Sequence, residues 1–370
     1  MADATIILAG GVGTRLWPAS LRESPKQLLR IGGGPSLIQR AITLAVAATA
    51  VGPIVIVTHR DHVRAIEEHV AQLEIDAPGV SGRVVYLPEP VGRNTAPAIA
   101  LGIIYLRSIL PGDAQVLVLT ADHVIGPPDQ FASDAAAACE LAASGNLVCF
   151  GITPDRPETG YGYIRAGVQR GRGFQVDAFT EKPDLPTAQE YLSRGGYYWN
   201  AGMFCFSIGG FLTEMGNHAP EIAAAFMDSG DAVGTEETPA GSRTADPDGL
   251  ATLYAGLPRI SIDYALMEKS PHVAVVPATF SWSDVGSWDE VARVPRDSSR
   301  DTADADRPGV IEVEADGNHV DSDLPVAICG VSDIHVVVRN GKVLVCRRGS
   351  SQLVKQVVET AESADMRDLL

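Results

Sequence analysis

The chain has 370 residues, which is enough for one large domain and a smaller one, each with its own hydrophobic core. Its 29 lysines and arginines stand against 46 aspartates and glutamates, and the net charge of -17 argues against nucleic acid or a membrane surface as the main partner. The five cysteines show neither a CxxC pair nor a disulfide framework, and no apolar stretch approaches the roughly 20 residues that span a bilayer. These features predict a cytoplasmic protein.

From the start to about residue 152, short apolar runs alternate with helical patterns. Strands are expected at 5–9, 54–58, 84–87, 116–120 and 147–152, and helices at 36–50, 61–73, 96–110 and 131–143. This alternation predicts an α/β, Rossmann-like domain with a mixed, mostly parallel central sheet. Ligands of such sheets lie at the carboxyl ends of strands, so the loops after Ala9, Leu87 and Thr120 are expected to share one crevice.

The pattern changes after residue 152 to glycine-rich and aromatic segments, which we expect to cover the crevice and to extend the sheet. Residues 228–249 hold almost no large apolar side chain and are predicted to form a mobile loop, and 295–308 a linker. Short strands are expected at 310–314, 326–329, 334–339 and 342–346, with Asn340-Gly341 as a hairpin turn. We therefore predict a catalytic domain over 1–294 and a small β-rich, β-helix-like domain over 309–370.

A glycine-rich bend, Gly10-Gly11-Val12-Gly13, follows the first strand, and Arg15 and Lys26 follow the bend. Glycines let backbone N–H groups approach an anion, an arginine can bind phosphate oxygens in pairs, and a lysine adds a compact charge. The spacing fits neither the GxGxxG fingerprint nor the GxxxxGK[ST] loop, which argues against a dehydrogenase or a P-loop ATPase. From this bend alone, a structural turn is as good an interpretation as a phosphate site.

Two carboxylates are candidate metal ligands. Asp122 follows an apolar strand, and Asp284 lies in a turn flanked by tryptophans. Two carboxylates near a triphosphate suit Mg²⁺, although a lone aspartate after a strand more commonly caps a loop, and Asp284 by itself is typical of a turn. Lys182 precedes a proline that fixes an extended backbone, but a solvated lysine is the simpler interpretation.

Taken with Ser24-Pro25-Lys26-Gln27, the glycine bend resembles the signature of the sugar nucleotidyltransferases, the NDP-sugar pyrophosphorylases. Further blocks, in order along the chain, are similar to the mannose-1-phosphate guanylyltransferases of that family: Glu89–Pro97, Ala121–His123, Thr159–Tyr163, Glu181–Asp184, Trp199–Met203, Ser261–Tyr264 and Trp282–Gly286. Ordered blocks from residue 5 to about residue 290 are far more specific than any one motif.

The resemblance implies a role for each matching residue. Nucleotide-binding positions are Leu8, Ala9, Gly10, Gly11, Gly13, Thr14, Arg15, Glu89, Asn94, Thr95 and Asp122, and sugar-phosphate-binding positions are Gly162, Glu181, Lys182, Asn200 and Asp263. The implied catalytic residues are Arg15, Lys26, Asp122, Lys182 and Asp284, with Asp122 and Asp284 as the Mg²⁺ ligands. From local sequence alone, Asn94-Thr95 is equally typical of a helix N-cap.

The implied reaction is Mg²⁺-dependent transfer of GMP from GTP to α-D-mannose 1-phosphate, which gives GDP-mannose and pyrophosphate. The resemblance also implies a homodimer, and the short tail leaves too little length for a fused isomerase, so we expect transferase activity only. Two alternatives stay open. The chain acts on another NTP and sugar 1-phosphate, or it is a catalytically silent regulatory subunit that binds nucleotide sugars.

Overall fold

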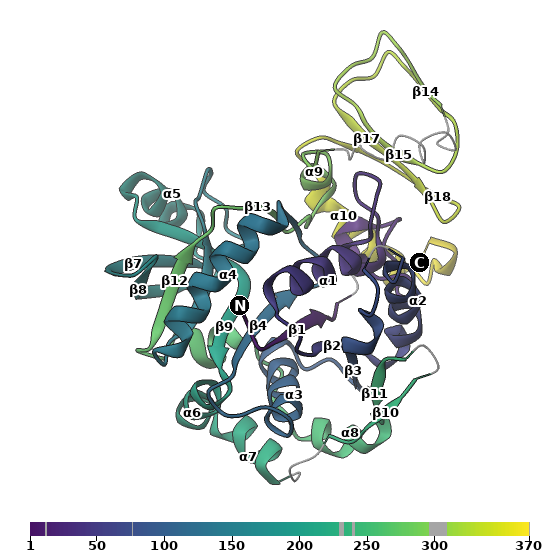
Figure 1. Ribbon diagram of the computed structural model, residues 1–370. Coiled ribbons are helices and arrows are strands. Elements are labelled where there is room, and N and C mark those ends of the chain that lie inside the picture. Colours follow the sequence, from purple (N-terminus) through teal and green to yellow (C-terminus); the bar gives the residue numbers. More distant parts are fainter. Residues whose placement is uncertain (12, 76, 229–232, 239–240, 296–308, 370) are drawn as a thin grey trace. The chain divides into compact units, whose positions relative to one another are not determined.

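The computed structural model describes residues 1–11, 13–75, 77–228, 233–238, 241–295 and 309–369 (Figure 1). They form two compact units. The first, which we call the sheet unit, comprises 1–10, 41–121 and 125–282, and the second, the tail unit, comprises 11–40, 122–124 and 283–370. The glycine bend therefore belongs, from Gly11 onward, to the same unit as the C-terminal region. The predicted linker at 295–308 lies, apart from residue 295, outside the described residues.

The sheet unit is built on an 11-stranded sheet with the order β10-β11-β3-β2-β1-β4-β9-β6-β12-β8-β7. In chain order these strands are β1 (Ala4–Ala9), β2 (Ile54–His59), β3 (Val84–Glu89), β4 (Gln115–Thr120), β6 (Leu147–Ile152), β7 (Tyr163–Arg170), β8 (Gly173–Thr180), β9 (Tyr197–Ser207), β10 (Thr235–Glu237), β11 (Arg243–Ala245) and β12 (Val273–Pro277). The predicted α/β class and mixed sheet are confirmed.

Parallel pairing is less dominant than expected. It runs without a break from β11 through β3, β2 and β1 to β4, and it returns between β6 and β12. The long strand β9 lies between β4 and β6 and is antiparallel to both, and β7 and β8 continue the sheet as an antiparallel pair. The aromatic segments after residue 152 therefore extend the sheet, as predicted.

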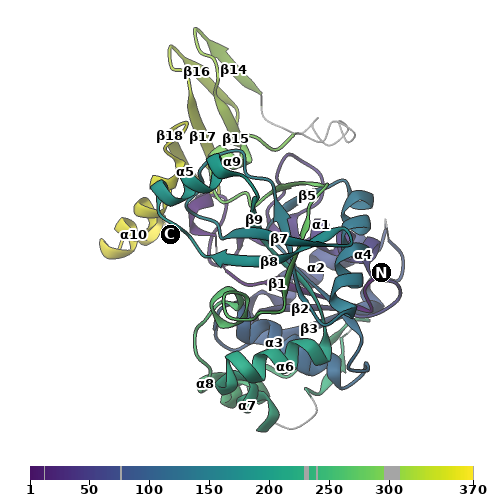
Figure 2. The same cartoon turned by 90° about the vertical axis from the view of Figure 1, so that its left-hand side faces the viewer.

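The helices of this region are α1 (Leu37–Ala48), which begins in the tail unit, α2 (Val63–Leu73), α3 (Thr95–Arg107), α4 (Pro128–Ala143), α5 (Leu185–Arg194), α6 (Ile208–His218), α7 (Pro220–Asp228) and α8 (Pro247–Ala255). Figure 2 shows α3 and α6 on one face of the sheet and α4 on the other. Every residue of α3 from Ala96 to Leu106 is buried, which explains its uniformly apolar sequence. No helix within the described part of the chain is long and apolar enough to cross a membrane.

The segment predicted as a mobile loop, 228–249, instead carries two strands where it is described. β10 and β11 pair with each other, and β11 also pairs with β3, so that β10 forms this edge of the sheet. Edge pairing satisfies backbone hydrogen bonds and requires few apolar side chains, so composition alone does not reveal it. Residues 229–232 and 239–240 of the predicted loop lie outside the described residues.

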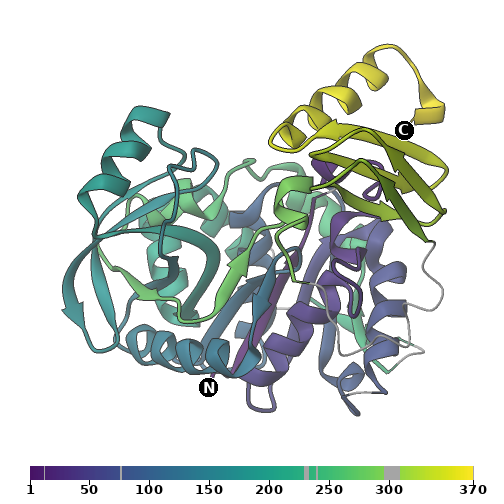
Figure 3. The same ribbon diagram turned by 90° about the horizontal axis from the view of Figure 1, so that it is seen from above.

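The tail unit holds α9 (Trp288–Val291), β14 (Val310–Val313), β15 (His319–Ser322), β16 (Val326–Cys329), β17 (Ile334–Arg339), β18 (Lys342–Arg347) and α10 (Val354–Ser363), while β5 (Val124–Gly126) and β13 (Ser281–Ser283) include points where the chain passes between the units. β14 pairs with β16 and β15 with β17 in parallel, and β17 and β18 form the predicted hairpin. Asn340 and Gly341 both have positive φ, as a tight hairpin turn requires. Figure 3 shows α10, which was not predicted, beside these strands.

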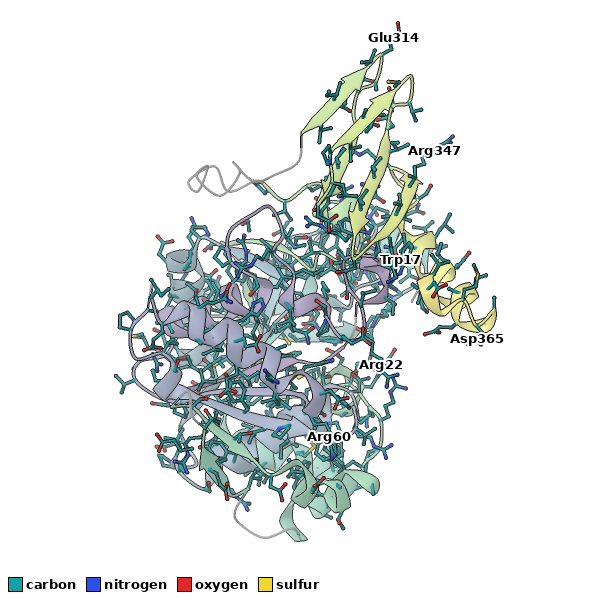
Figure 4. All side chains as sticks on the ribbon, turned by 90° about the vertical axis from the view of Figure 1, so that its right-hand side faces the viewer. Trp17, Arg22, Arg60, Glu314, Arg347 and Asp365 are labelled. Atoms are coloured by element: carbon teal, nitrogen blue, oxygen red, sulfur yellow. The ribbon has the colours of Figure 1, made fainter. Side chains whose placement is uncertain are left out.

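The core of the tail unit joins the segment after the glycine bend to the C-terminal region. Leu16 and Trp17 are buried in one apolar cluster with Trp288, Val337 and Val354. The indole N–H of Trp17 donates to the Leu369 carbonyl at 2.7 Å, and that of Trp288 donates to the Trp17 carbonyl at 3.0 Å. Figure 4 labels Trp17 within this unit. The bend is thus anchored by residues more than 250 positions away in sequence.

Candidate active site

Lys26 is the centre of a charged cluster in the tail unit. It begins a short 3-10 helix, η2 (Lys26–Leu28), and its side chain is 7% exposed. The Nζ atom donates to Oδ2 of Asp122 at 2.9 Å and to the carbonyl oxygen of Asp284 at 2.6 Å. Three residues predicted from separate parts of the sequence therefore meet at one ammonium group.

Gly13 is needed for this arrangement. Its φ is +73°, and a Cβ atom at this position would lie 2.5 Å from the Cβ of Lys26. Any other residue would be strained and would push the lysine away. Arg15 lies two residues later, exposed on η1 (Thr14–Leu16), and makes no hydrogen bond or ion pair to the described residues. Its guanidinium is available to an anion.

Asp122 is held in its charged form. Burial works against the carboxylate, but the charge of Lys26, that of His123 and the hydrogen bond from Lys26 together lower the pKa of Asp122. His123 Nε2 lies 3.6 Å from Oδ1 of Asp122. No role was assigned to His123 from the sequence, and its position directly after Asp122 was the one signal of this contact.

Asp284 lies in a tight turn that fixes its carboxylate. Gly286 donates its N–H to Oδ1 of Asp284 at 3.2 Å, and a Cβ at Gly286 would lie 2.7 Å from Oδ2. Val285 between them has a φ of +42°, which is rare for a β-branched residue, and it is fully buried in the core of the tail unit. Burial of Val285 offsets the strain of the turn that orients the Asp284 carboxylate.

A second group of predicted residues lies at the carboxyl ends of β1 and β3 in the sheet unit. Leu8 and Ala9 end β1, and a Cβ at Gly10 would lie 3.9 Å from Oε2 of Glu89, the last residue of β3. Burial raises the pKa of Glu89 to about 7. The hydroxyl of Tyr254 lies near enough to lower this pKa in part, although neither that hydroxyl nor Oε1 of Glu89 has a hydrogen bond of good geometry among the residues described. Buried polar atoms of this kind are suited to bind a ligand's donors and acceptors.

The Asn94-Thr95 pair has the capping role that local sequence allowed. The Asn94 side chain accepts a hydrogen bond from the Thr95 N–H at 2.8 Å at the start of α3. The Thr95 hydroxyl oxygen accepts one from the N–H of Ile262 at 2.9 Å. Residue 262 immediately precedes Asp263, one of the predicted sugar-binding residues.

The five predicted sugar-phosphate residues come together in the sheet unit. Asn200 donates from Nδ2 to Oδ1 of Asp263 at 2.8 Å, and its backbone N–H donates to the carbonyl of Gly162. A Cβ at Gly162 would lie 2.6 Å from Oε2 of Glu181, so a larger residue there would require the Glu181 carboxylate to shift. Glu181 forms a close ion pair with Lys182, whose side chain is 58% exposed.

The acids of this group influence one another. Burial and the charge of Glu181 raise the pKa of Asp263 to about 6. Asp263 begins a π-helical turn, η5 (Asp263–Met267), a feature often found at functional sites. Glu268 follows this turn and accepts the backbone N–H of Glu181 at 3.0 Å. Sequence reasoning missed Glu268, which no motif marked.

Comparison with known proteins identifies the family of this chain. A profile of the nucleotidyl transferase family matches residues 4–300. The chain belongs to the nucleotidyl transferase family. It is 40% identical over 360 residues to the xanthan biosynthesis protein XanB of Xanthomonas campestris pv. campestris, covering 97% of this chain and 73% of that one. It is 38% identical over 369 residues to a mannose-1-phosphate guanylyltransferase of Escherichia coli K12, covering 96% of this chain and 72% of that one.

The likeness extends to a solved structure. The crystal structure named mannose-1-phosphate geranyltransferase, from Thermus thermophilus, superposes with a TM-score of 0.78 at 31% identity and covers 97% of this chain and 99% of that one. This nucleotidyl transferase therefore shares its fold with that protein over nearly the whole of both chains.

Nucleotidyl transferases generally use a divalent metal, and the tail unit offers suitable oxygen ligands. The carboxylates of Asp122 and Asp284 project from turns that Lys26 holds together. Such hard oxygen donors suit a hard cation such as Mg²⁺. The described residues contain no group of three or more His, Cys, Asp or Glu side chains placed to hold a metal. A metal at the two aspartates would therefore take its other ligands from phosphate and water.

Proposed function

We propose that this chain transfers GMP from GTP to α-D-mannose 1-phosphate and so produces GDP-mannose and pyrophosphate. The observation that carries the proposal is the similarity, over nearly the whole chain, to a protein named mannose-1-phosphate guanylyltransferase. The contacts of Lys26 with Asp122 and Asp284, and the contact of Asn200 with Asp263, support it because residues from distant parts of the sequence meet there as the proposed roles require.

The reaction needs alignment and charge neutralisation more than proton transfer. The attacking phosphate oxygen of mannose 1-phosphate is already anionic, so no general base is required. We assign Lys182 to that phosphate, and Arg15 and Lys26 to the β- and γ-phosphates that leave. A Mg²⁺ ion held by Asp122 and Asp284 would supply positive charge to the triphosphate. No covalent enzyme intermediate is involved.

Substrate recognition is assigned to the two groups in the sheet unit. The buried carboxyl group of Glu89, which lies close to Gly10, suits the N–H donors of a guanine edge, and we assign Asn94 and Thr95 to the nucleotide as well. Glu181, Asn200 and Asp263 are carboxylate and amide groups that suit sugar hydroxyls. Gly162 gives these side chains the space in which they meet.

A panel of nucleoside triphosphates and sugar 1-phosphates, followed by pyrophosphate release, tests the proposal. We expect the highest kcat/KM with GTP and mannose 1-phosphate, and a loss of turnover of at least about a hundredfold in Asp284→Ala. Asp323→Ala, at an exposed position of the same unit, is the matched control. Preference for another pair would show a different transferase, and binding without turnover of any pair would show a regulatory subunit.

We further propose Mg²⁺ as the metal and a cytoplasmic homodimer that has neither nucleic acid nor membrane as a partner. The net charge of -17 supports the last point, and five free thiols suit a reducing compartment. Large apolar side chains of the tail unit support dimerisation: Ile311 on β14 and Val343 and Val345 on β18 are 60–64% exposed. Sedimentation of the wild type beside Ile311→Glu would test this surface.

A further inference from the structure

Arg93 lies in the block Glu89–Pro97, which carries several proposed nucleotide-binding residues, yet none of the roles assigned above uses it. Its half-buried side chain reaches α8, 161 positions further along the chain. There Nε donates to the Tyr254 carbonyl at 3.1 Å, and Nη2 donates to the Ala255 carbonyl at 3.2 Å. Arg93 forms no ion pair with the described residues, so these two bonds are the contacts that its charge makes.

The two acceptors belong to the last turn of α8, where backbone carbonyls have no partner within the helix. An arginine at this end satisfies such carbonyls, and its positive charge is favoured by the helix dipole. Leu250 and Tyr254 lie on one face of α8 and are buried in the core of the sheet unit, against which the helix packs beside β3 (Figure 1). The guanidinium of Arg93 therefore fixes the turn from which Tyr254 enters the core.

Tyr254 brings its hydroxyl group to the carboxyl group of Glu89. Burial raises the pKa of Glu89, and the Tyr254 hydroxyl and the backbone N–H of Arg93 each lower that pKa in part, because both favour the charged carboxylate. Tyr254 is 0% exposed and Glu89 6% exposed, so water does not replace these contacts. The position of the tyrosine therefore decides how the carboxylate is presented at the end of β3.

A separate set of bonds ties the backbone of this loop to the segment after α8. The N–H of Ile260 donates to the Arg93 carbonyl, and the N–H of Ala96 donates to the Ile260 carbonyl, both at 3.2 Å. These bonds use backbone atoms alone, and they remain possible when the Arg93 side chain is changed. A substitution of Arg93 should thus loosen α8 and Tyr254 without releasing the segment that leads to Asp263.

We propose that Arg93 is a positioning residue for base recognition, which caps α8, holds Tyr254 against Glu89 and so orients the Glu89 carboxylate toward the guanine edge. This inference rests on the proposed function, which assigns Glu89 to that edge. A carboxylate can accept one N–H from N1 of guanine and a second from its 2-amino group. Hypoxanthine, the base of ITP, has the first donor and lacks the second. Arg93 therefore contributes to the choice of GTP over ITP through the carboxylate that it helps to orient.

The test compares kcat/KM for GTP and for ITP, at saturating mannose 1-phosphate, in the full-length wild type, Arg93→Gln and Tyr254→Phe. The wild type should prefer GTP by at least about tenfold, the usual effect of one hydrogen bond to a charged group. Each variant should reduce this preference at least about fivefold through a higher KM for GTP, while kcat and KM for mannose 1-phosphate stay within about twofold. Arg259→Gln, which removes an exposed arginine of the neighbouring segment, should keep the wild-type preference.

The double variant of Arg93→Gln and Tyr254→Phe should lose no more preference than the stronger single variant, because both changes act on one carboxylate. Tyr254→Phe keeps the buried ring, so it tests the inference even if Arg93→Gln does not fold. An unchanged preference in Tyr254→Phe, or additive losses in the double variant, would overturn the inference and leave GDP-mannose synthesis by the wild type intact. A wild type that uses ITP as well as GTP would also overturn it. A wild type that makes no GDP-mannose would instead overturn the proposed function, and the inference with it.

Discussion

The Thr95 hydroxyl links residues proposed to bind the nucleotide to residues proposed to bind the sugar, because it accepts a hydrogen bond from Ile262, the residue before Asp263. Thr95→Val keeps the shape of the side chain but removes the acceptor, so the backbone N–H of Ile262 loses its partner. Such a loss costs about 1–3 kcal/mol. We expect KM for mannose 1-phosphate to rise about tenfold, more than KM for GTP, while Thr95→Ser behaves as the wild type. Steady-state kinetics with each substrate varied in turn would measure both KM values. A change in KM for GTP alone would show that Thr95 does not support the residues proposed to bind the sugar.

Glu89 should make stability depend on pH. Its pKa is about 7 in the folded protein against an ordinary value of 4.5, so the folded state holds the proton more tightly. The stability that this neutral acid contributes is complete below about pH 4.5 and is lost as the pH rises to about 7, by at most about 3 kcal/mol. Glu89→Gln should therefore be more stable than the wild type at pH 8 and nearly equal to it at pH 4.5. Urea unfolding at a series of pH values gives the free energy of unfolding of the wild type, of Glu89→Gln and of the exposed control Glu140→Gln. If the free energies of the wild type and Glu89→Gln changed with pH in parallel, Glu89 would not be the source of the pH dependence.

At the scale of elements, α10 completes the core that holds the glycine bend. Val358 on its inner face is 8% exposed and packs with Leu16 and Trp17, whereas its neighbour Val357 is 39% exposed. A charge placed at the inner position would be buried without a partner. We expect Val358→Asp to lower the free energy of unfolding by about 3 kcal/mol or more and Val357→Asp by less than about 1 kcal/mol. Thermal melting compares the two, and similar losses would mean that this face of α10 is not part of the core.

The elements that sequence predicted are those whose signal is local. β1 and α3 are continuous apolar runs because both are buried on all sides, and so their position and type were clear. β11 was missed because it is defined by its pairing with β3, which no local pattern shows. α10 was missed because its apolar stripe is narrow, and the stripe is buried only through contacts with distant parts of the chain. The same limit applies to the site. Motifs marked Lys26, but its contacts with Asp122 and Asp284 join residues 96 and 258 positions apart.

At the scale of the whole molecule, the two compact units of the structure do not follow the order of the sequence. A boundary near residue 294 was predicted from composition, and it places the glycine bend in one domain and the C-terminal strands in another. In the structure, residues 11–40 and 283–370 belong to a single compact unit. Leu16 and Trp17 share its core with Val337 and Val354. The segment that carries Arg15 and Lys26 therefore depends on residues from the far end of the chain.

A chain ended after Val294 distinguishes these two descriptions. If 1–294 is an independent domain, it will melt like the full-length protein and bind GTP equally well. The shared core predicts otherwise, because Leu16 and Trp17 would lose the apolar partners supplied by β17, β18 and α10. Loss of such burial costs about 1.5–3 kcal/mol for each large side chain. We expect the truncated chain to unfold at least about 10 °C below the full-length protein and to bind GTP weakly, and co-production of residues 295–370 as a separate chain to restore much of both properties.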